Sequence, residues 1–182
     1  MIEGIAVFGS SEPPPGDPEY DRARRIGSLL AREGVPVVCG GYGGVMEGAS
    51  RGAREAGGTA IGVGCALFAS RRPNPYLSEF IEEPDLPART ARLVALARGF
   101  IILPGKSGTL AEVAYLWALR RAGLAKGKPV VLLGDPWPDV LDRLAAAGVL
   151  EADSLRETVL ARNENEAVSK ALAGSGGPQE TP

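Results

Sequence analysis

Short apolar runs alternate with longer, mixed segments along most of the chain. The runs are apolar at consecutive positions rather than at every second one, which is typical of parallel strands that helices cover on both faces. The strands predicted from this pattern are residues 5–8, 35–39, 59–63, 78–82, 100–103 and 129–133, with a further edge strand at 157–160.

Segments of helical length lie between these runs. Asp17 followed by Pro18 is a favourable helix start, because an aspartate caps free amides and proline fits the first turn. Gly34 is the expected stop of the same helix. The predicted helices are residues 18–33, 44–56, 87–97, 109–121, 139–146 and 164–172, and a loop is predicted over 64–76.

The alternation of strands and helices predicts an α/β fold with a doubly wound parallel sheet and helices on both faces. Residues 1–173 are predicted to form a single domain, since 182 residues suit one domain with a sizeable core. Residues 174–182 are mostly Gly, Ser, Pro and Thr, with nothing to bury. We predict a disordered tail there.

Charge and composition limit the partners of the chain. The net charge is −2 and no basic stripe is present, which disfavours nucleic-acid binding. No apolar stretch approaches the length needed to cross a membrane. Cys39 and Cys65 have apolar and glycine neighbours and no metal-ligand spacing, so we predict buried free thiols in a reducing compartment. These features together predict a cytoplasmic protein with no membrane contact.

The chain contains no histidine. This excludes the commonest general base, the Ser–His triad and most zinc chemistry. We therefore predict neither a metal nor a cofactor, and any chemistry must use carboxylates, arginines, hydroxyls and backbone amides.

Three turns after predicted strands have an unusual composition, namely residues 9–11, 40–44 and 104–109. Ligands of open parallel sheets bind beyond the carboxyl ends of the strands, where these turns lie. Four of the five residues in 40–44 are glycine, directly before a helix. Glycine allows a ligand to approach the backbone, and a helix N-terminus attracts anions. The alternative is a tight packing turn; the G-x-G-x-x-G dinucleotide spacing is absent.

The third turn adds the hydroxyls of Ser107 and Thr109 and the cation of Lys106, without the spacing of a nucleoside triphosphate loop. Glu112 lies one helical turn beyond Thr109 and shares its helix face. A carboxylate beside an anion site fits a reaction with a cationic transition state. It fits equally well a residue that complements the helix N-terminus. Arg89 is the other charged candidate, and its alternative is a solvated surface arginine.

Residues 104–112, Pro-Gly-Lys-Ser-Gly-Thr-Leu-Ala-Glu, resemble the PGGxGTxxE signature of the LOG family. This family was long labelled lysine decarboxylase-like and includes cytokinin-activating phosphoribohydrolases. Residues 40–46 resemble its other glycine-rich motif, and residues 8–20 resemble its opening. The resemblance implies a Rossmann-like fold, a homodimer with sites at or near the interface, and a functional role for Arg89.

Two positions depart from the family pattern. Lys106 replaces the second signature glycine and is expected to narrow the turn, and Glu47 stands where cytokinin-activating members usually have glycine. Both departures place the chain among looser relatives, which include a molybdenum-cofactor carrier. The lysine decarboxylase label is rejected, because no lysine has the surroundings that pyridoxal phosphate requires.

The resemblance implies hydrolysis of a nucleoside 5'-monophosphate to free base and ribose 5-phosphate. Glu112 would stabilise the cationic ribose and orient water, and Arg89 would position the nucleotide or assist departure of the base. The predicted phosphate- and nucleotide-binding residues are Ser10, Gly41, Gly43, Gly44, Met46, Gly105, Ser107, Gly108 and Thr109.

Two other functions remain open at this point. A non-catalytic carrier or sensor of a phosphorylated pterin or nucleotide would use the same phosphate-binding turns, although it has little use for Glu112. A DNA-processing role is disfavoured by the acidic balance of the chain.

Overall fold

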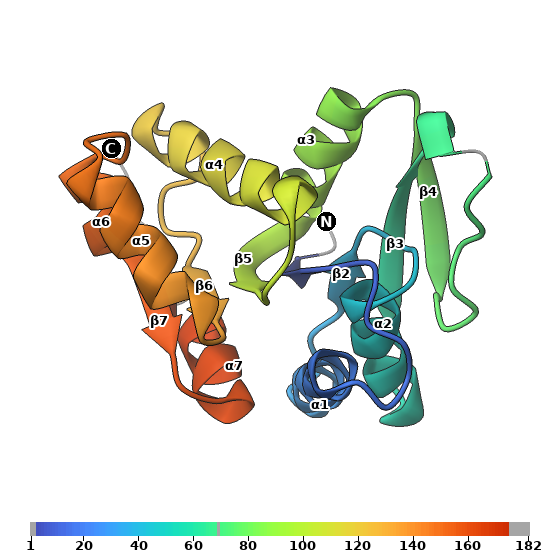
Figure 1. Ribbon diagram of the computed structural model, residues 1–182. Helices are drawn as coiled ribbons and strands as arrows, with labels where there is room; N and C mark the ends of the chain where they lie inside the picture. The colour runs from blue at the N-terminus through green and yellow to red at the C-terminus, as the bar shows by residue number, and fades with distance from the viewer. Residues whose placement is uncertain (1–2, 69, 175–182) are drawn as a thin grey trace, which may run out of the picture.

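One central sheet separates two layers of helices in the computed structural model, which describes residues 3–68 and 70–174 (Figure 1). The strands are β1 (Gly4–Phe8), β2 (Val37–Cys39), β3 (Ala60–Cys65), β4 (Glu79–Glu83), β5 (Ala97–Ile102), β6 (Val130–Leu133) and β7 (Thr158–Ala161). They are all parallel and follow the order β4-β3-β2-β1-β5-β6-β7. The prediction of a doubly wound, Rossmann-like parallel sheet is therefore confirmed.

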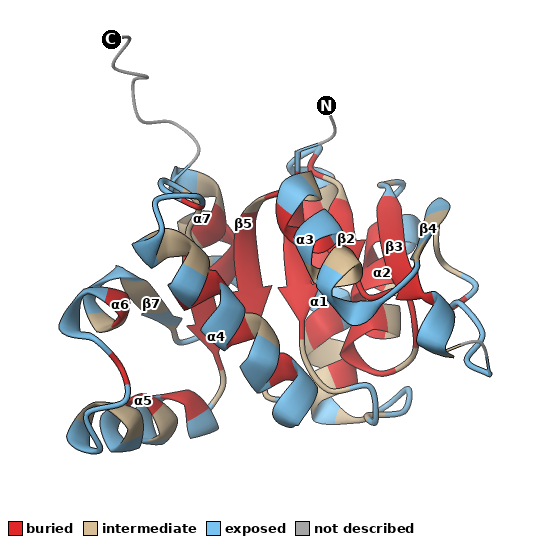
Figure 2. Ribbon diagram, turned by 90° about the horizontal axis from the view of Figure 1, so that it is seen from above, coloured by how far each residue is buried: buried red, intermediate tan, exposed pale blue. Residues whose placement is uncertain are grey.

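Helices cover both faces of this sheet, as the continuous apolar runs predicted. One layer contains α1 (Pro18–Arg32), α2 (Val45–Glu55) and α7 (Glu164–Ala173); the other contains α3 (Leu86–Leu96), α4 (Ser107–Arg121), α5 (Pro136–Ala146) and the short α6 (Ala152–Glu157). Figure 2 shows the inner strands as a buried layer, with the edge strands β4 and β7 only partly buried and exposed residues on the outer sides of the helices. Both free cysteines are buried, as predicted.

The two-residue period of the strands divides the core into two halves. Ile5 and Val7 of β1 pack in the cluster with α1, α2 and α7. Ala6 and Phe8, which alternate with them, pack in the cluster with α3, α4 and α5. Successive side chains of a strand point to opposite faces, so the inner strands contribute to both halves of the core.

The sequence signals at the ends of α1 act as expected. The Asp17 side chain accepts a hydrogen bond of 2.8 Å from the Glu19 amide, and Pro18 occupies the first turn. Gly34, with φ +69°, follows the end of the helix. In the middle of α1, a Cβ at Gly27 would collide with the Ala49 carbonyl of α2. The two helices therefore approach closely, which holds the turns before them side by side.

Some boundaries differ from the prediction. Helix α6 was not predicted, because residues 152–157 contain a single large apolar side chain, Leu155, and no helical period. Strand β5 starts at Ala97, directly after α3, whereas the helix was predicted to end at residue 97 and the strand to start at residue 100. In the predicted loop, Ala66–Phe68 form a short 3-10 helix, η1. Gly174 caps α7, and the rest of the predicted disordered tail lies outside the described residues.

The direction of the strand order changes between β1 and β5. From β1 the chain adds β2, β3 and β4 on one side, and then returns to add β5, β6 and β7 on the other. Ligands of doubly wound folds bind in the crevice at the carboxyl ends of the strands at such a point. None of the described helices combines the length and the hydrophobicity that a bilayer crossing requires.

Candidate active site

A cavity of about 300 Å³ opens at the carboxyl edge of the sheet, near the change of strand direction. The turn after β1, the start of α2, the loop after β3, α3 and the start of α4 all contribute to its wall. The predicted site residues that line it are Ser10, Met46, Arg89, Ser107, Gly108, Thr109 and Glu112. The structure thus brings together side chains that are up to about one hundred residues apart in sequence.

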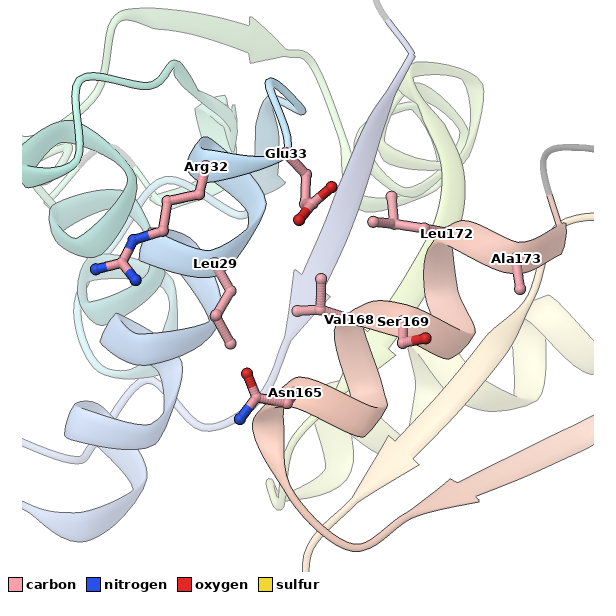
Figure 3. A pocket seen from close by; sticks show the side chains of 8 residues that line it. All are labelled: Leu29, Arg32, Glu33, Asn165, Val168, Ser169, Leu172 and Ala173. Atoms are coloured by element: carbon pink, nitrogen blue, oxygen red, sulfur yellow. The ribbon is translucent and has the colours of Figure 1, made fainter.

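A larger cavity of about 500 Å³ lies between α1 and α7 (Figure 3). Leu29 and Val168 extend toward each other across it, and Arg32 and Asn165 also line it. None of the predicted site residues contributes to this cavity. The candidate site is therefore the smaller cavity at the carboxyl edge.

Backbone hydrogen bonds hold the three predicted turns against one another. The Val45 amide donates to the Ser10 carbonyl at 2.9 Å, which joins the second turn to the first. The Ser10 amide donates to the Pro104 carbonyl at 3.1 Å, which joins the first turn to the third. The cavity is therefore built on a rigid framework of backbone rather than on side chains alone.

Four predicted binding residues, Gly41, Gly43, Gly44 and Gly105, do not line the cavity but shape its framework. Gly44 has φ +68°, and a Cβ there would collide with the Ser10 carbonyl. A Cβ at Gly105 would collide with the Thr109 side chain. By contrast, a Cβ at Gly108 would meet no atom within 4 Å, so Gly108 faces open space at the start of α4.

The start of α4 carries no capping group of its own. Lys106 occupies the N-cap position without a side-chain hydrogen bond to the helix, and the first turn contains no acidic residue. The first N–H groups of an α-helix have no intrahelical acceptor, and the helix dipole adds partial positive charge there. With the hydroxyls of Ser107 and Thr109 beside it, this end of the cavity suits an anion.

Glu112 and Arg89 form a nearly buried ion pair in the cavity wall. The Arg89 Nη1 atom lies 3.6 Å from Glu112 Oε1, and the two side chains are 11% and 15% exposed. The Arg89 Nε group also donates to the Val63 carbonyl at 2.9 Å. A Cβ at Gly40 would collide with the guanidinium, so this turn glycine leaves the space that Arg89 fills.

The environment of Glu112 alters its acidity. Burial raises the pKa of Glu112 to about 7, because the cavity wall removes water from the charged form. The guanidinium of Arg89 opposes this effect, and burial prevails. A carboxyl group that titrates near neutral pH is suited to accept a proton or to stabilise a neighbouring cation.

Comparison with known proteins agrees with this geometry. The model of the SLOG cluster4 family, a LOG-like family, matches residues 3–169. The chain belongs to this family. The resemblance of the three motifs to LOG proteins is thereby confirmed.

Named relatives of this SLOG protein include enzymes and a carrier. The pyrimidine/purine nucleotide 5'-monophosphate nucleosidase of Escherichia coli is 32% identical over 126 residues, which cover 64% of this chain and 28% of the enzyme. A cytokinin riboside 5'-monophosphate phosphoribohydrolase of Mycobacterium marinum is 27% identical over 179 residues. The aligned region covers 93% of this chain and 94% of the relative. The molybdenum cofactor carrier protein of Chlamydomonas reinhardtii has a TM-score of 0.72 at 26% identity, with 95% and 98% of the two chains aligned.

Of the two departures from the LOG pattern, Glu47 faces away from the cavity. Its Oε1 atom accepts a hydrogen bond of 3.0 Å from the Tyr20 hydroxyl, between α1 and α2. Burial, together with this carboxylate, raises the pKa of Tyr20 to about 12. Glu47 therefore acts in helix packing and does not line the site.

The other departure, Lys106, lies at the mouth of the cavity. Its φ of −100° and ψ of −156° are extended backbone that a lysine adopts without strain. The Nζ atom forms an ion pair of 2.8 Å with Glu12, and the two side chains are 74% and 62% exposed. Replacing the signature glycine thus adds a cation and a bridge between the first and third turns.

Sequence analysis missed Asn74, which supports the glycine-rich turn. Its amide donates to the Gly41 carbonyl at 2.9 Å, and its side chain donates to the Tyr42 carbonyl at 3.1 Å. The Ser50 hydroxyl lies beside it and donates to the Met46 carbonyl at 2.8 Å. Because Asn74 is buried in a loop without a periodic pattern, only its neighbour Pro75 and the loop length mark it in the sequence.

Phe68, Arg71 and Tyr42 also line the cavity and were not among the predicted site residues. In the sequence, the only feature that marks this part of the cavity lining is the Arg71-Arg72 pair, which lies in the loop after a predicted strand. Among residues 3–68 and 70–174, no three Cys, Asp or Glu side chains gather as a set of metal ligands.

Proposed function

We propose that the protein hydrolyses the N-glycosidic bond of a nucleoside 5'-monophosphate and releases free base and ribose 5-phosphate. The observation that carries this proposal is the buried Glu112–Arg89 pair beside the uncapped start of α4. A hydrolase is supported by the names of relatives such as the Escherichia coli nucleosidase. Because the chain spans 28% of the length of that enzyme, the substrate class is part of the proposal.

The phosphate of the substrate would bind at the start of α4. The free amides of Ser107, Gly108 and Thr109 and the hydroxyls of Ser107 and Thr109 would donate to its oxygens. Lys106 would add a positive charge at the mouth. Binding energy from this end of the substrate holds C1' of the ribose beside Glu112, which is the residue one turn further along α4.

The reaction would pass through a ribose with oxocarbenium character, as in glycoside hydrolysis. The bond between C1' and the base nitrogen breaks, and its electron pair leaves with the base. A water oxygen forms the new bond to C1'. The Glu112 carboxylate stabilises the positive charge and takes a proton from this water. The departing base nitrogen takes up a proton from solvent, and Glu112 then releases to solvent the proton that it took from the water, so that each cycle consumes one water and restores the Glu112 carboxylate.

Arg89 would orient this chemistry. Its hydrogen bond to the Val63 carbonyl and its contact with Glu112 fix the guanidinium against the cavity wall. From there it can hold the nucleotide and favour departure of the base. It also keeps part of Glu112 in the charged form that the reaction requires.

The proposal is tested by incubating the protein with purine and pyrimidine nucleoside 5'-monophosphates and measuring released ribose 5-phosphate. The matched control is the corresponding nucleosides, which lack the anion for the start of α4. We expect release from at least one monophosphate and none from its nucleoside. Absence of release from every monophosphate would contradict the proposal.

A carrier of a phosphorylated pterin is the second candidate function, because the molybdenum cofactor carrier of Chlamydomonas reinhardtii aligns over almost the whole chain. The same anion-binding turns would hold the phosphate of such a ligand. Saturable binding of a phosphorylated ligand, without release of ribose 5-phosphate from any nucleotide, would favour this function over hydrolysis.

We also propose that the protein acts as a cytoplasmic homodimer. Support comes from exposed apolar side chains on α3 and α4, whose outer sides are partly exposed in Figure 2. Leu86 of α3 is 44% exposed, and Leu110 and Tyr115 of α4 are 43% and 38% exposed. A second copy of the chain would cover these side chains, close to the helix that carries Glu112.

A further inference from the structure

The candidate active site has two chemically different ends. At the start of α4 it is lined by Ser107, Gly108 and Thr109, which suit an anion. Its other wall contains Tyr42, Met46 and Phe68, with Arg71 beside them. A ligand that fills both ends therefore carries an anionic group and a flat, apolar group.

The aromatic wall is held in a fixed orientation. The Tyr42 hydroxyl accepts a hydrogen bond of 3.0 Å from the Cys65 amide, and its ring is buried. The Phe68 ring packs on Tyr42 with centroids 5.9 Å apart and an interplanar angle of 81°. Tyr42 also packs against Phe80, at 6.2 Å. Phe68 thus stands on a rigid base while its own side chain remains partly exposed to the cavity.

Arg71 completes a stacked pair with Phe68. Its guanidinium lies 5.1 Å from the centre of the Phe68 ring, and its amide donates to the Phe68 carbonyl at 2.7 Å. Guanidinium planes and phenyl rings are the two kinds of side chain on which nucleobases stack. An arginine held on a phenylalanine at the rim of a cavity therefore offers a flat, cationic surface for a base.

We propose that Phe68 and Arg71 form the base-binding wall of this site and that they read the base by stacking. This inference rests on the proposed function and assigns the direction of the nucleotide in the cavity. The phosphate lies at the start of α4, C1' of the ribose lies beside Glu112, and the base lies against Phe68 and Arg71. The scissile bond is then between the two walls.

The chemistry of the wall also determines which bases are accepted. Tyr42, Met46 and Phe68 offer no free amide or carboxylate for the edge of a base, since the Tyr42 hydroxyl is engaged with the Cys65 backbone. Stacking depends on ring area rather than on edge groups, because every base has a π-face. We expect purine nucleotides, whose bases have the larger ring area, to bind more tightly than pyrimidine nucleotides.

The test compares binding of AMP with binding of ribose 5-phosphate, which has the phosphate and sugar but no base. Titration calorimetry on the Glu112→Gln protein measures both affinities without turnover. We expect AMP to bind about ten-fold more tightly than ribose 5-phosphate, because stacking of one base on an aromatic side chain contributes a gain in affinity of this order. Phe68→Leu and Arg71→Ala should each lower this preference several-fold and leave ribose 5-phosphate binding unchanged.

Two neighbouring residues provide matched controls. Leu67 and Arg72 are exposed, adjacent in sequence to the wall residues, and do not line the cavity. Leu67→Ala and Arg72→Ala should keep the full preference for AMP. Phe68→Leu retains apolar packing on Tyr42, and its circular dichroism and melting temperature verify that the variant is folded.

Three results would overturn the inference. An unchanged AMP preference in both Phe68→Leu and Arg71→Ala would place the base elsewhere. If Phe68→Leu and Arg71→Ala weaken the binding of AMP and of ribose 5-phosphate equally, these residues maintain the shape of the cavity and do not contact the base. If AMP and ribose 5-phosphate bind equally to the Glu112→Gln protein while the parent protein turns over nucleotides, the proposed function stands and the base-binding wall fails.

Discussion

The Arg89 Nη1 atom of α3 lies 3.6 Å from the Glu112 Oε1 atom of α4. Burial raises the pKa of Glu112 more than the Arg89 guanidinium lowers it. A buried carboxylate beside a cation, at the edge of a sheet where ligands bind, is costly for folding and useful for catalysis. This pair is the centre of the proposed mechanism.

The first prediction concerns pH. Because the reaction requires the Glu112 carboxylate and its pKa is about 7, kcat/KM should rise as pH increases through this value. Arg89→Gln removes the charge that lowers this pKa, so the Glu112 pKa should rise further. Carbon-13 NMR of the glutamate carboxyl groups measures the shift. A Glu112 signal that titrates with an unchanged midpoint in Arg89→Gln would contradict the assignment.

The second prediction uses two neighbouring glycines. Gly44 has φ +68° and no room for a Cβ beside the Ser10 carbonyl, whereas a Cβ at Gly43 would come no closer than 3.6 Å to Ser11. Gly44→Ala should lower the free energy of unfolding by about 2 kcal/mol or more. Gly43→Ala should change it by less than about 1 kcal/mol. Urea denaturation of both variants tests this difference. Equal losses of unfolding free energy would contradict the claim that the turn requires glycine at position 44.

The third prediction concerns the cation at the mouth. Lys106→Ala should weaken binding of ribose 5-phosphate several-fold at low salt, with a smaller effect at high salt. Its stability should change by less than about 1 kcal/mol, since the ion pair with Glu12 is exposed. Glu12→Ala should tighten binding, because it frees the Lys106 ammonium. Lys126→Ala, an exposed lysine away from the cavity, is the control. Unchanged binding in Lys106→Ala would remove Lys106 from the site.

The fourth prediction tests the proposed dimer. Leu110→Glu places a charge at an exposed apolar position of α4 and should convert a dimer into a monomer in sedimentation analysis. Val149→Glu changes an apolar residue outside α3 and α4 that is 68% exposed, against 43% for Leu110, and should leave the assembly unchanged. A monomeric parent protein, or a dimer that tolerates Leu110→Glu, would contradict the proposal.

Local patterns predicted the sheet and most helices, because each element has a clear signal. Continuous apolar runs such as residues 100–103 indicate buried parallel strands, and Asp17, Pro18 and Gly34 mark the ends of α1. Helix α6 has no such signal, since its burial depends on packing against α5 and β7 rather than on its own period.

Only the site residues that belong to recognisable sequence motifs, or lie beside them, could be predicted. Glu112 and Arg89 were identified from sequence, but their 3.6 Å contact depends on how α3 and α4 pack. Phe68, Arg71 and Asn74 lie in an irregular loop, where no period distinguishes a wall residue from a solvated one. Of the four turn glycines that do not line the cavity, Gly41, Gly44 and Gly105 leave no room for a Cβ, and composition does not separate a packing role from ligand binding.

The most direct test of the proposed hydrolysis is a single-turnover measurement on Glu112→Gln. Release of ribose 5-phosphate from a bound nucleoside 5'-monophosphate is followed in the parent protein, in Glu112→Gln and in Glu47→Gln. The last variant removes a carboxylate that contacts Tyr20 outside the cavity. We predict a rate at least about one thousand-fold lower in Glu112→Gln, with nucleotide affinity within a few-fold, and no change in Glu47→Gln. Cleavage at the parent rate in Glu112→Gln would contradict the account.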